Sequence, residues 1–209
     1  MRAVDSGRIA YQKQGKRMNV REGLGLDGQV GLVTGAASGL GFAIAQALAE
    51  AGATAVLTDV DAAGLERAVE AIRADGGSAE GVLCDVSDRP LLRGVFDDVA
   101  GRHGRLDIAV ANAGVTAGPG YLTEAGQINA VDDARWDQVL SVNLTGVFAT
   151  IQAAAKHMKP RRSGRIVAVA SVAGLKSEVM CGYAYTATKA GVVNLVRQAA
   201  MELSRYAIT

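Results

Sequence analysis

Short apolar segments alternate with helical patterns from residue 29 to the end of the chain, and this alternation constrains the fold more than any other feature. The apolar segments have the length of strands and lie at 29–33, 53–57, 81–84, 107–110 and 165–170. Between them, apolar residues recur at helical spacing, as Leu65, Val69 and Ile72 do within 62–74. We expect Ser87 to cap the helical pattern that follows 81–84. Apolar strands separated by helices form a parallel sheet with helices on both faces. We therefore expect an α/β fold with a doubly wound parallel sheet, whose ligands bind at the carboxyl ends of the strands.

The first apolar segment runs into Thr34–Gly41, a turn with the spacing Gly-x-x-x-Gly-x-Gly that opens the next helical pattern. Glycine lets the backbone approach a pyrophosphate closely, and the free N–H groups of a helix start attract its negative charge. The same pattern also occurs where a turn only packs tightly, so the glycines alone do not decide. The residues of this turn that we expect to contact a dinucleotide are Gly35, Ser38, Gly39, Leu40 and Gly41.

An acidic residue, Asp59, follows the second apolar segment about 20 residues beyond the glycines. At that position of a dinucleotide-binding fold, a carboxylate accepts hydrogen bonds from the 2′-hydroxyl of NAD and repels the 2′-phosphate of NADP. No Arg or Lys occurs in Thr34–Gly41 or directly after Asp59 to bind that phosphate. A helix N-cap is the competing role for Asp59, and Asp61 could fill that role as well. The sequence thus predicts NAD as the cofactor.

Composition limits the classes of function. The 209 residues, 49% of them hydrophobic, suffice for one substantial core. A formal net charge of +1 gives no electrostatic basis for binding nucleic acid or an anionic membrane. Cys84 and Cys181 lie far apart, and His103 and His157 are isolated on predicted helices. We expect free thiols in a reducing, cytoplasmic compartment and no metal site.

Residues 1–28 differ from the rest, because their basic residues are scattered among polar ones without an apolar run. A signal peptide needs such a run and a membrane span needs a longer one, so neither is predicted. We expect a disordered N-terminal extension over 1–28, or upstream sequence before a start at Met18. A single catalytic, dinucleotide-binding domain is expected over 29–209.

Tyr185 and Lys189 lie four residues apart on one predicted helix, so their side chains share a face. A tyrosine has a pKa of about 10, and a nearby ammonium group favours its ionised form. Ser171 ends the preceding strand at the same edge of the sheet, where its hydroxyl is placed to bind a carbonyl or alkoxide oxygen. A Tyr-x-x-x-Lys pair arises easily by chance, but much less easily after a strand-ending serine in a chain with a dinucleotide turn.

The segment 115–131 has no clear periodicity and contains Gly118, Gly120 and Gly126. Long loops without structure in compact domains tend to be functional lids or disordered insertions. Since this segment leaves the carboxyl end of a strand, where ligands bind, we expect it to be a lid.

In this order, the motifs resemble the short-chain dehydrogenase/reductase family from residue 29 to the end. The resemblance implies a Rossmann-type sheet and further cofactor contacts at Asp85, Val86, Asn112, Ala113 and Gly114, with Asp85 at the adenine. It also implies that Tyr185 is the general acid or base and that Ser171 polarises the substrate oxygen. Lys189 would bind the nicotinamide ribose, beside Tyr185, and lower the tyrosine pKa, while Asn143 would hold a water in a proton relay.

Two features depart from the family pattern. The usual Asn-Asn-Ala-Gly is Ala111-Asn112-Ala113-Gly114 here, which removes one polar group near the cofactor. The chain also stops at Thr209, where relatives continue into a sixth strand, a substrate-covering segment and a seventh strand. We therefore expect a sheet that lacks the family's last one or two strands, in a fragment of a longer protein rather than a natural truncation. The segment 165–170 would then be an aggregation-prone sheet edge that nothing in the sequence covers.

The functional hypothesis is an NAD-dependent alcohol dehydrogenase or ketone reductase for a small hydroxyl or carbonyl substrate. One alternative, favoured by the chain end, is a catalytically impaired fragment that binds a nucleotide or oligomerises. The other, disfavoured by Asp59, is an NADP-dependent 3-oxoacyl-carrier reductase. The helical segments 136–159 and 183–205 are apolar and rich in small alanines, and relatives pair such helices. We expect a homodimer or homotetramer.

Overall fold

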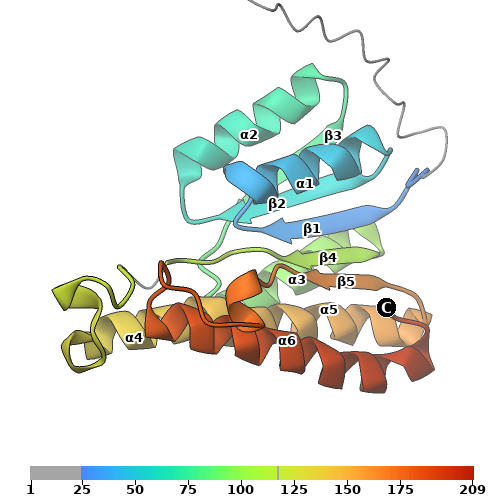
Figure 1. Ribbon diagram of the computed structural model, residues 1–209. Coiled ribbons are helices and arrows are strands. Elements are labelled where there is room, and N and C mark those ends of the chain that lie inside the picture. The colour runs from blue at the N-terminus through green and yellow to red at the C-terminus, as the bar shows by residue number, and fades with distance from the viewer. Residues whose placement is uncertain (1–24, 117) are drawn as a thin grey trace, which may run out of the picture.

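The computed structural model describes residues 25–116 and 118–209, which form a five-stranded parallel sheet and its helices (Figure 1). The strands are β1 (Val30–Thr34), β2 (Thr54–Asp59), β3 (Ser78–Leu83), β4 (Ile108–Ala111) and β5 (Arg165–Ala168). Their order is β3-β2-β1-β4-β5, so the direction of winding reverses between β1 and β4. The predicted doubly wound α/β sheet is confirmed.

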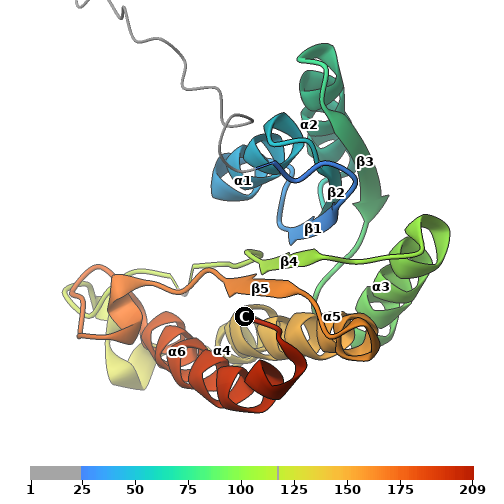
Figure 2. The ribbon, with the colours of Figure 1, turned by 90° about the vertical axis from the view of Figure 1, so that its right-hand side faces the viewer.

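Helices cover both faces of this sheet (Figure 2). Those on one face are α1 (Gly39–Glu50) and α2 (Ala62–Ala74), and those on the other are α3 (Arg89–His103), α5 (Val147–Arg161) and α6 (Tyr183–Leu203). Successive side chains of a strand point to opposite faces. In β1, Leu32 therefore enters the core against α3 and α5, whereas Val33 enters the core against α1 and α2.

A single continuous helix is built from α4 (Asp133–Leu140), a π-helical segment (Ser141–Gly146) and α5. The sequence predicted that this helix ends before Pro160, and that prediction is wrong. Pro160 lies in the last turn, and the cap is Arg162 in the left-handed conformation, with φ of 50°. A proline so close to the end removes a single backbone hydrogen bond, which the packing of the helix on the sheet tolerates.

The same helix, 133–161, is long enough to span a membrane and contains an 18-residue window with a mean hydropathy of 1.2. It is the one such helix in the described part of the chain, and 56% of its most apolar window is buried inside the fold. Core helices of α/β domains reach this hydropathy because they pack on a sheet, so the value has a structural explanation.

The helix starts follow local capping chemistry. Asp61 caps α2 by accepting a hydrogen bond from the Gly64 N–H at 3.0 Å, so Asp59 is not needed there. The predicted cap of α3, Ser87, is wrong by one position. Asp88 caps that helix by accepting from the Leu91 N–H at 3.0 Å, and the Ser87 hydroxyl donates to Asp85 instead, at 2.7 Å.

Most of the predicted N-terminal extension, 1–28, lies outside the described residues. Its last residues belong to the folded domain, because the Leu26 N–H donates to the Ala51 carbonyl at 2.8 Å and the Leu26 side chain packs against the core under α1 and α2. The predicted lid, 115–131, is less irregular than expected. Short 3₁₀ helices lie at Glu124–Gly126 and Ile128–Ala130.

The outer side of β5 is partly covered, which corrects the expectation that nothing in the sequence could cover it. Beyond α6 the chain turns back, and Ile208 forms a parallel bridge with Gly164 (Figure 2). The Ile166 N–H donates to the Thr209 carbonyl at 2.7 Å, and the Thr209 N–H donates to the Gly164 carbonyl at 3.2 Å. Ile208 is 1% exposed. These residues occupy the position of a sixth strand at the start of β5.

At the amino ends of the strands, Asp107 ties three elements together. Its carboxylate accepts hydrogen bonds from Arg105 at 2.7 and 2.9 Å, from Arg161 at the end of α5 at 2.8 Å, and from the Val30 N–H of β1 at 2.9 Å. Burial alone would raise the pKa of Asp107, but these donors outweigh it and lower the pKa to about 2. The carboxylate is therefore a structural anion, remote from the ligand-binding edge.

Replacement of this anion should destabilise the fold. Because the folded-state pKa lies below that of an unfolded aspartate, about 3.9, the stabilisation is present at neutral pH and is lost as pH falls through about 4 to 2. We expect Asp107→Asn to lower the free energy of unfolding at pH 7 by about 1–3 kcal/mol and by much less at pH 2.5, measured by urea titration. Asp97→Asn is the control, because the Asp97 pair with Lys156 is exposed. Equal unfolding of the two variants at pH 7 would contradict this role.

Candidate active site

The turn between β1 and α1 forms a cradle of backbone atoms at the carboxyl edge of the sheet. Gly35 has φ of +65°, and a Cβ there would lie 2.7 Å from the Cα of Ala113. A Cβ on Gly41 would lie 2.0 Å from the Gly35 carbonyl oxygen, so both positions require glycine. Ser38 is the N-cap residue of α1, but its side chain makes no capping hydrogen bond. The first turn of α1, which begins at Gly39, contains no acidic residue. The helix start thus keeps its N–H groups and the Ser38 hydroxyl for an anion.

Thr34 and Asn112 bind the ends of β1 and β4 to each other. The Thr34 hydroxyl oxygen accepts from the backbone N–H groups of Asn112 and Ala113, each at 3.1 Å. The Asn112 amide donates to the carbonyls of Thr34 at 3.0 Å and Gly35 at 2.9 Å. Thr34 was not among the predicted site residues, although it opens the glycine motif. Its role becomes visible only when two strands far apart in sequence are paired.

The Asp59 carboxylate is held by backbone donors at the end of β2. It accepts from the N–H groups of Ala37 at 3.0 Å, Val60 at 2.8 Å and Asp61 at 3.1 Å. The bond to Ala37 crosses to the glycine turn, so the carboxylate has a fixed position beside the cradle. A carboxylate that binds a ribose hydroxyl needs such a fixed position. Asp59 does not accept from the N–H groups in the first turn of α2, as a helix cap would, because Asp61 has that role.

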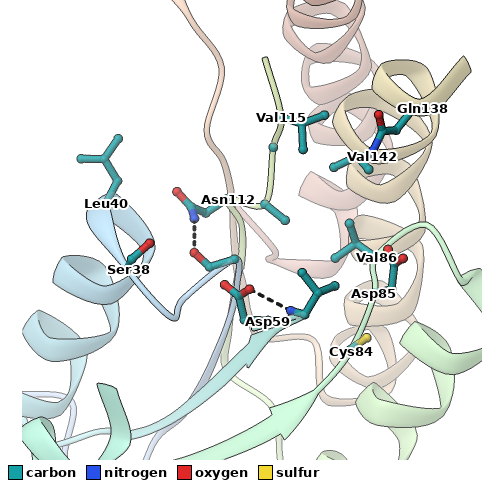
Figure 3. A pocket seen from close by; sticks show the side chains of 14 residues that line it. Ser38, Leu40, Asp59, Cys84, Asp85, Val86, Asn112, Val115, Gln138 and Val142 are labelled. Atoms are coloured by element: carbon teal, nitrogen blue, oxygen red, sulfur yellow. Dashed lines mark hydrogen bonds between the residues drawn. The ribbon is translucent and has the colours of Figure 1, made fainter. Parts of the chain in front are cut away.

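A cavity of about 460 Å³ opens over these residues, within the range of small-molecule sites (Figure 3). Ser38, Leu40 and Asp59 lie on one side of it, and Asp85, Val86 and Val142 lie on the opposite side. The residues that line it are Gly35, Ser38, Leu40, Asp59, Val60, Cys84, Asp85, Val86, Asn112, Ala113, Gly114, Val115, Gln138 and Val142. Neither Lys nor Arg occurs among these lining residues, so a second phosphate group on the ribose would meet no cation there.

Several lining residues were not predicted. Val60 follows Asp59 directly, whereas Val115, Gln138 and Val142 come from segments whose approach depends on the tertiary fold. Cys84 also faces the cavity. Burial, with Asp85 and Asp88 adding their charge, raises the pKa of its thiol to about 11, so the thiol is neutral at physiological pH. No pattern in the sequence signals these contacts.

Asn143 lies in the π-helical segment and is fully buried, at 0% exposure. Its side-chain oxygen accepts from the Val115 N–H and its amide donates to the Val115 carbonyl, both at 2.8 Å. The side chain therefore anchors the chain as it leaves β4. Each polar atom of the Asn143 side chain thus has a backbone partner in Val115.

Lys189 is the buried charge of the site, with 4% exposure. Its ammonium group donates to the Val169 carbonyl at 2.7 Å and lies 5.7 Å from the centre of the Tyr185 ring. Burial lowers the pKa of Lys189. A Cβ on Gly114 would lie 3.8 Å from the Lys189 nitrogen and 3.4 Å from the Asn143 oxygen. The predicted catalytic residues Asn143 and Lys189 thus meet the predicted cofactor contact Gly114 at one place.

Ser171 follows β5 and caps the short 3₁₀ helix Val172–Gly174 by accepting from the Ala173 N–H at 3.2 Å. That 3₁₀ helix packs against α6, where a Cβ on Gly174 would lie 2.5 Å from the Lys189 carbonyl oxygen. The Ser171 hydroxyl still has a hydrogen to donate. In the described residues, the Tyr185 hydroxyl has no hydrogen-bond partner and none links it to Ser171. Both hydroxyls are therefore available to a ligand.

Known proteins of one family are similar to this chain. The sequence pattern described as short chain dehydrogenase matches residues 29–209. D-threitol dehydrogenase of Mycolicibacterium smegmatis is 39% identical, covering 90% of this chain and 70% of the relative. Cyclohexanol dehydrogenase of a Rhodococcus species is also 39% identical, covering 90% of this chain and 73% of the relative.

Solved structures agree. A metagenomic short-chain oxidoreductase in complex with NADP is 38% identical, with a TM-score of 0.80 over 88% of this chain and 80% of that one. A short-chain dehydrogenase/reductase from Burkholderia xenovorans is 36% identical, with a TM-score of 0.81 over 88% of this chain and 72% of that one. The chain spans 53 to 73% of the length of eight curated relatives. With the family pattern matched throughout the domain, the chain belongs to the short-chain dehydrogenase/reductase family of oxidoreductases.

Proposed function

We propose that this protein transfers a hydride between NAD(H) and an alcohol or ketone, with Tyr185 as the general acid or base. The observation that carries the proposal is the buried Lys189 ammonium group, which lies beside the Tyr185 ring and near Gly114 after β4. The nicotinamide, when bound, supplies the hydride chemistry. The cradle suits its pyrophosphate, because glycines and free helix N–H groups present no side chain or anion there.

The protein's own part is to hold the substrate oxygen and to move a proton. For alcohol oxidation, the Tyr185 oxygen takes the hydroxyl proton, and for ketone reduction it returns the proton to the developing alkoxide. The Ser171 hydroxyl donates a hydrogen bond to the same substrate oxygen. Lys189 places its positive charge 5.7 Å from the centre of the Tyr185 ring, in a buried setting where water screens that charge little. Asn143 holds the chain that leaves β4 in place through its two hydrogen bonds to the Val115 backbone.

Removal of the tyrosine hydroxyl tests the chemistry. We expect Tyr185→Phe to lower kcat by about 10²–10⁴-fold while NADH affinity stays within about threefold, because only the transferable proton is lost. Lys189→Ala should reduce both turnover and NADH affinity. The measurement is steady-state turnover with a ketone, together with NADH fluorescence titration. Tyr206→Phe is the matched control, since that tyrosine lies in the 3₁₀ helix after α6, at the opposite end of α6 from Tyr185. Substantial activity in Tyr185→Phe would exclude this mechanism.

We further propose a preference for NAD over NADP. What supports it is Asp59, whose carboxylate is fixed by three backbone donors beside the cradle, and the absence of Lys and Arg among the residues that line the cavity. The metagenomic relative was solved with NADP, which is a fact about that protein. In this chain, the charge of Asp59 and the lack of Lys and Arg among the lining residues favour NAD.

The cofactor preference depends on one charge. We expect wild-type kcat/KM to be at least tenfold higher with NADH than with NADPH, and Asp59→Asn to reduce this ratio by about tenfold. The asparagine keeps an acceptor for the backbone donors while it removes the charge that repels a 2′-phosphate. Asp61→Asn controls for local charge, since Asp61 caps α2. A wild-type protein that uses NADPH as well as NADH would rule out the assignment.

We also propose a homodimer or homotetramer formed through α5 and α6, in a reducing, cytoplasmic compartment. Support comes from a groove of about 370 Å³ between these helices, lined by Phe148, Ile151, Ala155, Leu195 and Ala199 among others. Phe148 is 43% exposed there, and both described cysteines are free thiols.

A charge in the groove should disrupt this assembly. We expect Phe148→Glu to shift the protein towards monomer at micromolar concentration, measured by sedimentation velocity, because it replaces an exposed aromatic side chain of the groove with a carboxylate that would lose its hydration on association. Leu91→Glu on α3, which is comparably exposed outside the groove, should leave the sedimentation coefficient unchanged. A wild-type protein that sediments as a monomer would contradict the proposed interface.

A further inference from the structure

The loops that follow β4 and β5 carry an unusual number of exposed apolar side chains. The loop after β4 presents Tyr121 and Leu122, and the loop after β5 presents Val172, Leu175, Val179 and Met180. Leu122 and Leu175 are each 72% exposed and Met180 is 79% exposed. Apolar residues gathered on one surface region of a soluble domain usually mark a binding site. We call these six residues the apolar rim.

The two loops are joined to each other. A Cβ on Gly120 would lie 1.7 Å from the Val179 carbonyl oxygen, so the backbones meet in a contact that only glycine permits. Gly126 makes a second close backbone contact, with Gly120, since a Cβ on Gly126 would lie 2.1 Å from the Gly120 carbonyl oxygen. Both loops lie at the same end of the molecule in the two views (Figures 1 and 2). The rim is therefore one assembled surface rather than two independent loops.

This surface adjoins the proposed reactive residues along the chain. Val172, 58% exposed, directly follows Ser171, and the loop after β5 leads into the first turn of α6, which holds Tyr185. The charges within the loop neutralise each other, because Lys176 and Glu178 form an ion pair at 3.0 Å. Arg135, beneath the loop after β4, is bound to the Gln138 side chain and the Thr116 carbonyl. Neither the Gln138 amide nor the Thr116 carbonyl carries a charge, so Arg135 remains a positive group beneath the loop after β4, although it is not one of the six rim residues.

We infer that the apolar rim binds the hydrocarbon part of the substrate, so that the preferred substrates are apolar secondary alcohols and ketones with several carbons beyond the reacting centre. The inference rests on the proposed function and names the substrate class of the same site. The rim carries no charged side chain and a single polar side-chain group, the Tyr121 hydroxyl, so it offers a polyol or a 2-oxo acid few polar partners. Each methylene buried against the rim should improve binding by up to about fourfold.

The test compares ketones of increasing length on the full chain. Saturation-transfer NMR and turnover are measured for acetone, 2-butanone, 2-octanone and pyruvate, with and without NADH. We expect 2-octanone to bind at least tenfold more tightly than 2-butanone, and pyruvate to bind no better than acetone. Equal affinity for 2-butanone and 2-octanone would overturn the inference, and would indicate that another protein segment covers the rim. Because binding is observed directly, failure of NADH binding would count against the proposed function alone.

Two variants localise the effect. Gly120→Ala should separate the loops and lower the affinity for 2-octanone by at least fivefold, with NADH affinity unchanged. Gly94→Ala on α3 is its control, because a Cβ there meets nothing within 4 Å. Since Gly120→Ala could unfold its loop, the paired change Leu175→Gln and Met180→Gln tests the same surface without backbone strain. If 2-octanone retains its full advantage over 2-butanone in the paired variant, the rim is not its binding site.

Discussion

The hydrogen bonds between Thr34 and Asn112 are the interaction on which the site depends. They join β1 to β4, the two strands between which the sheet reverses its winding. A reversal sends one connecting helix to each face, so the loops at the carboxyl ends diverge and leave a crevice. Without a bond across that crevice, the glycine turn and the segment 112–115 would be separate loops. The Thr34 hydroxyl and the Asn112 amide make them one floor, against which Gly35 can approach Ala113.

From this floor the reactive groups are positioned through a short series of contacts. Val115 follows Asn112 by three residues, and its backbone N–H and carbonyl are hydrogen-bonded to the Asn143 side chain. Gly114 lies close to both the Asn143 side-chain oxygen and the Lys189 nitrogen. Polar side chains in this series are satisfied by the backbone. Among the described residues the Tyr185 hydroxyl has no partner, and the Ser171 hydroxyl, which accepts from the Ala173 N–H, keeps its hydrogen to donate. A buried residue that bonds only to main chain holds its position in every state of the reaction, so positioning and chemistry are assigned to different residues.

Much of the fold could be predicted because its signals are local. The apolar segments became five strands within a few residues of their expected bounds, and the predicted helix over 62–74 matches α2. Failures occurred where tertiary contacts outweigh local preference. Pro160 is tolerated because α5 packs on the sheet, and Asp88 rather than Ser87 caps α3 because Ser87 bonds to Asp85. The pairing of Ile208 with Gly164 has no signal in the sequence. Likewise, motif order identified Asp59 and Lys189, but Thr34 and Gln138 depend on strand order and helix packing.

The π-helical segment at Ser141–Gly146 has a mechanical consequence. Each residue advances an α-helix by about 100°, so a widened turn that takes in one extra residue rotates everything before it relative to everything after it. The face of α5 that packs on β4 and α3 is thereby set independently of the face through which Gln138 and Val142 reach the cavity. One long helix can thus pack against the sheet over one part of its length and line the cavity over another. The sheet fixes the phase of its second half, whereas its first half packs against α6 and presents Gln138 to the cavity.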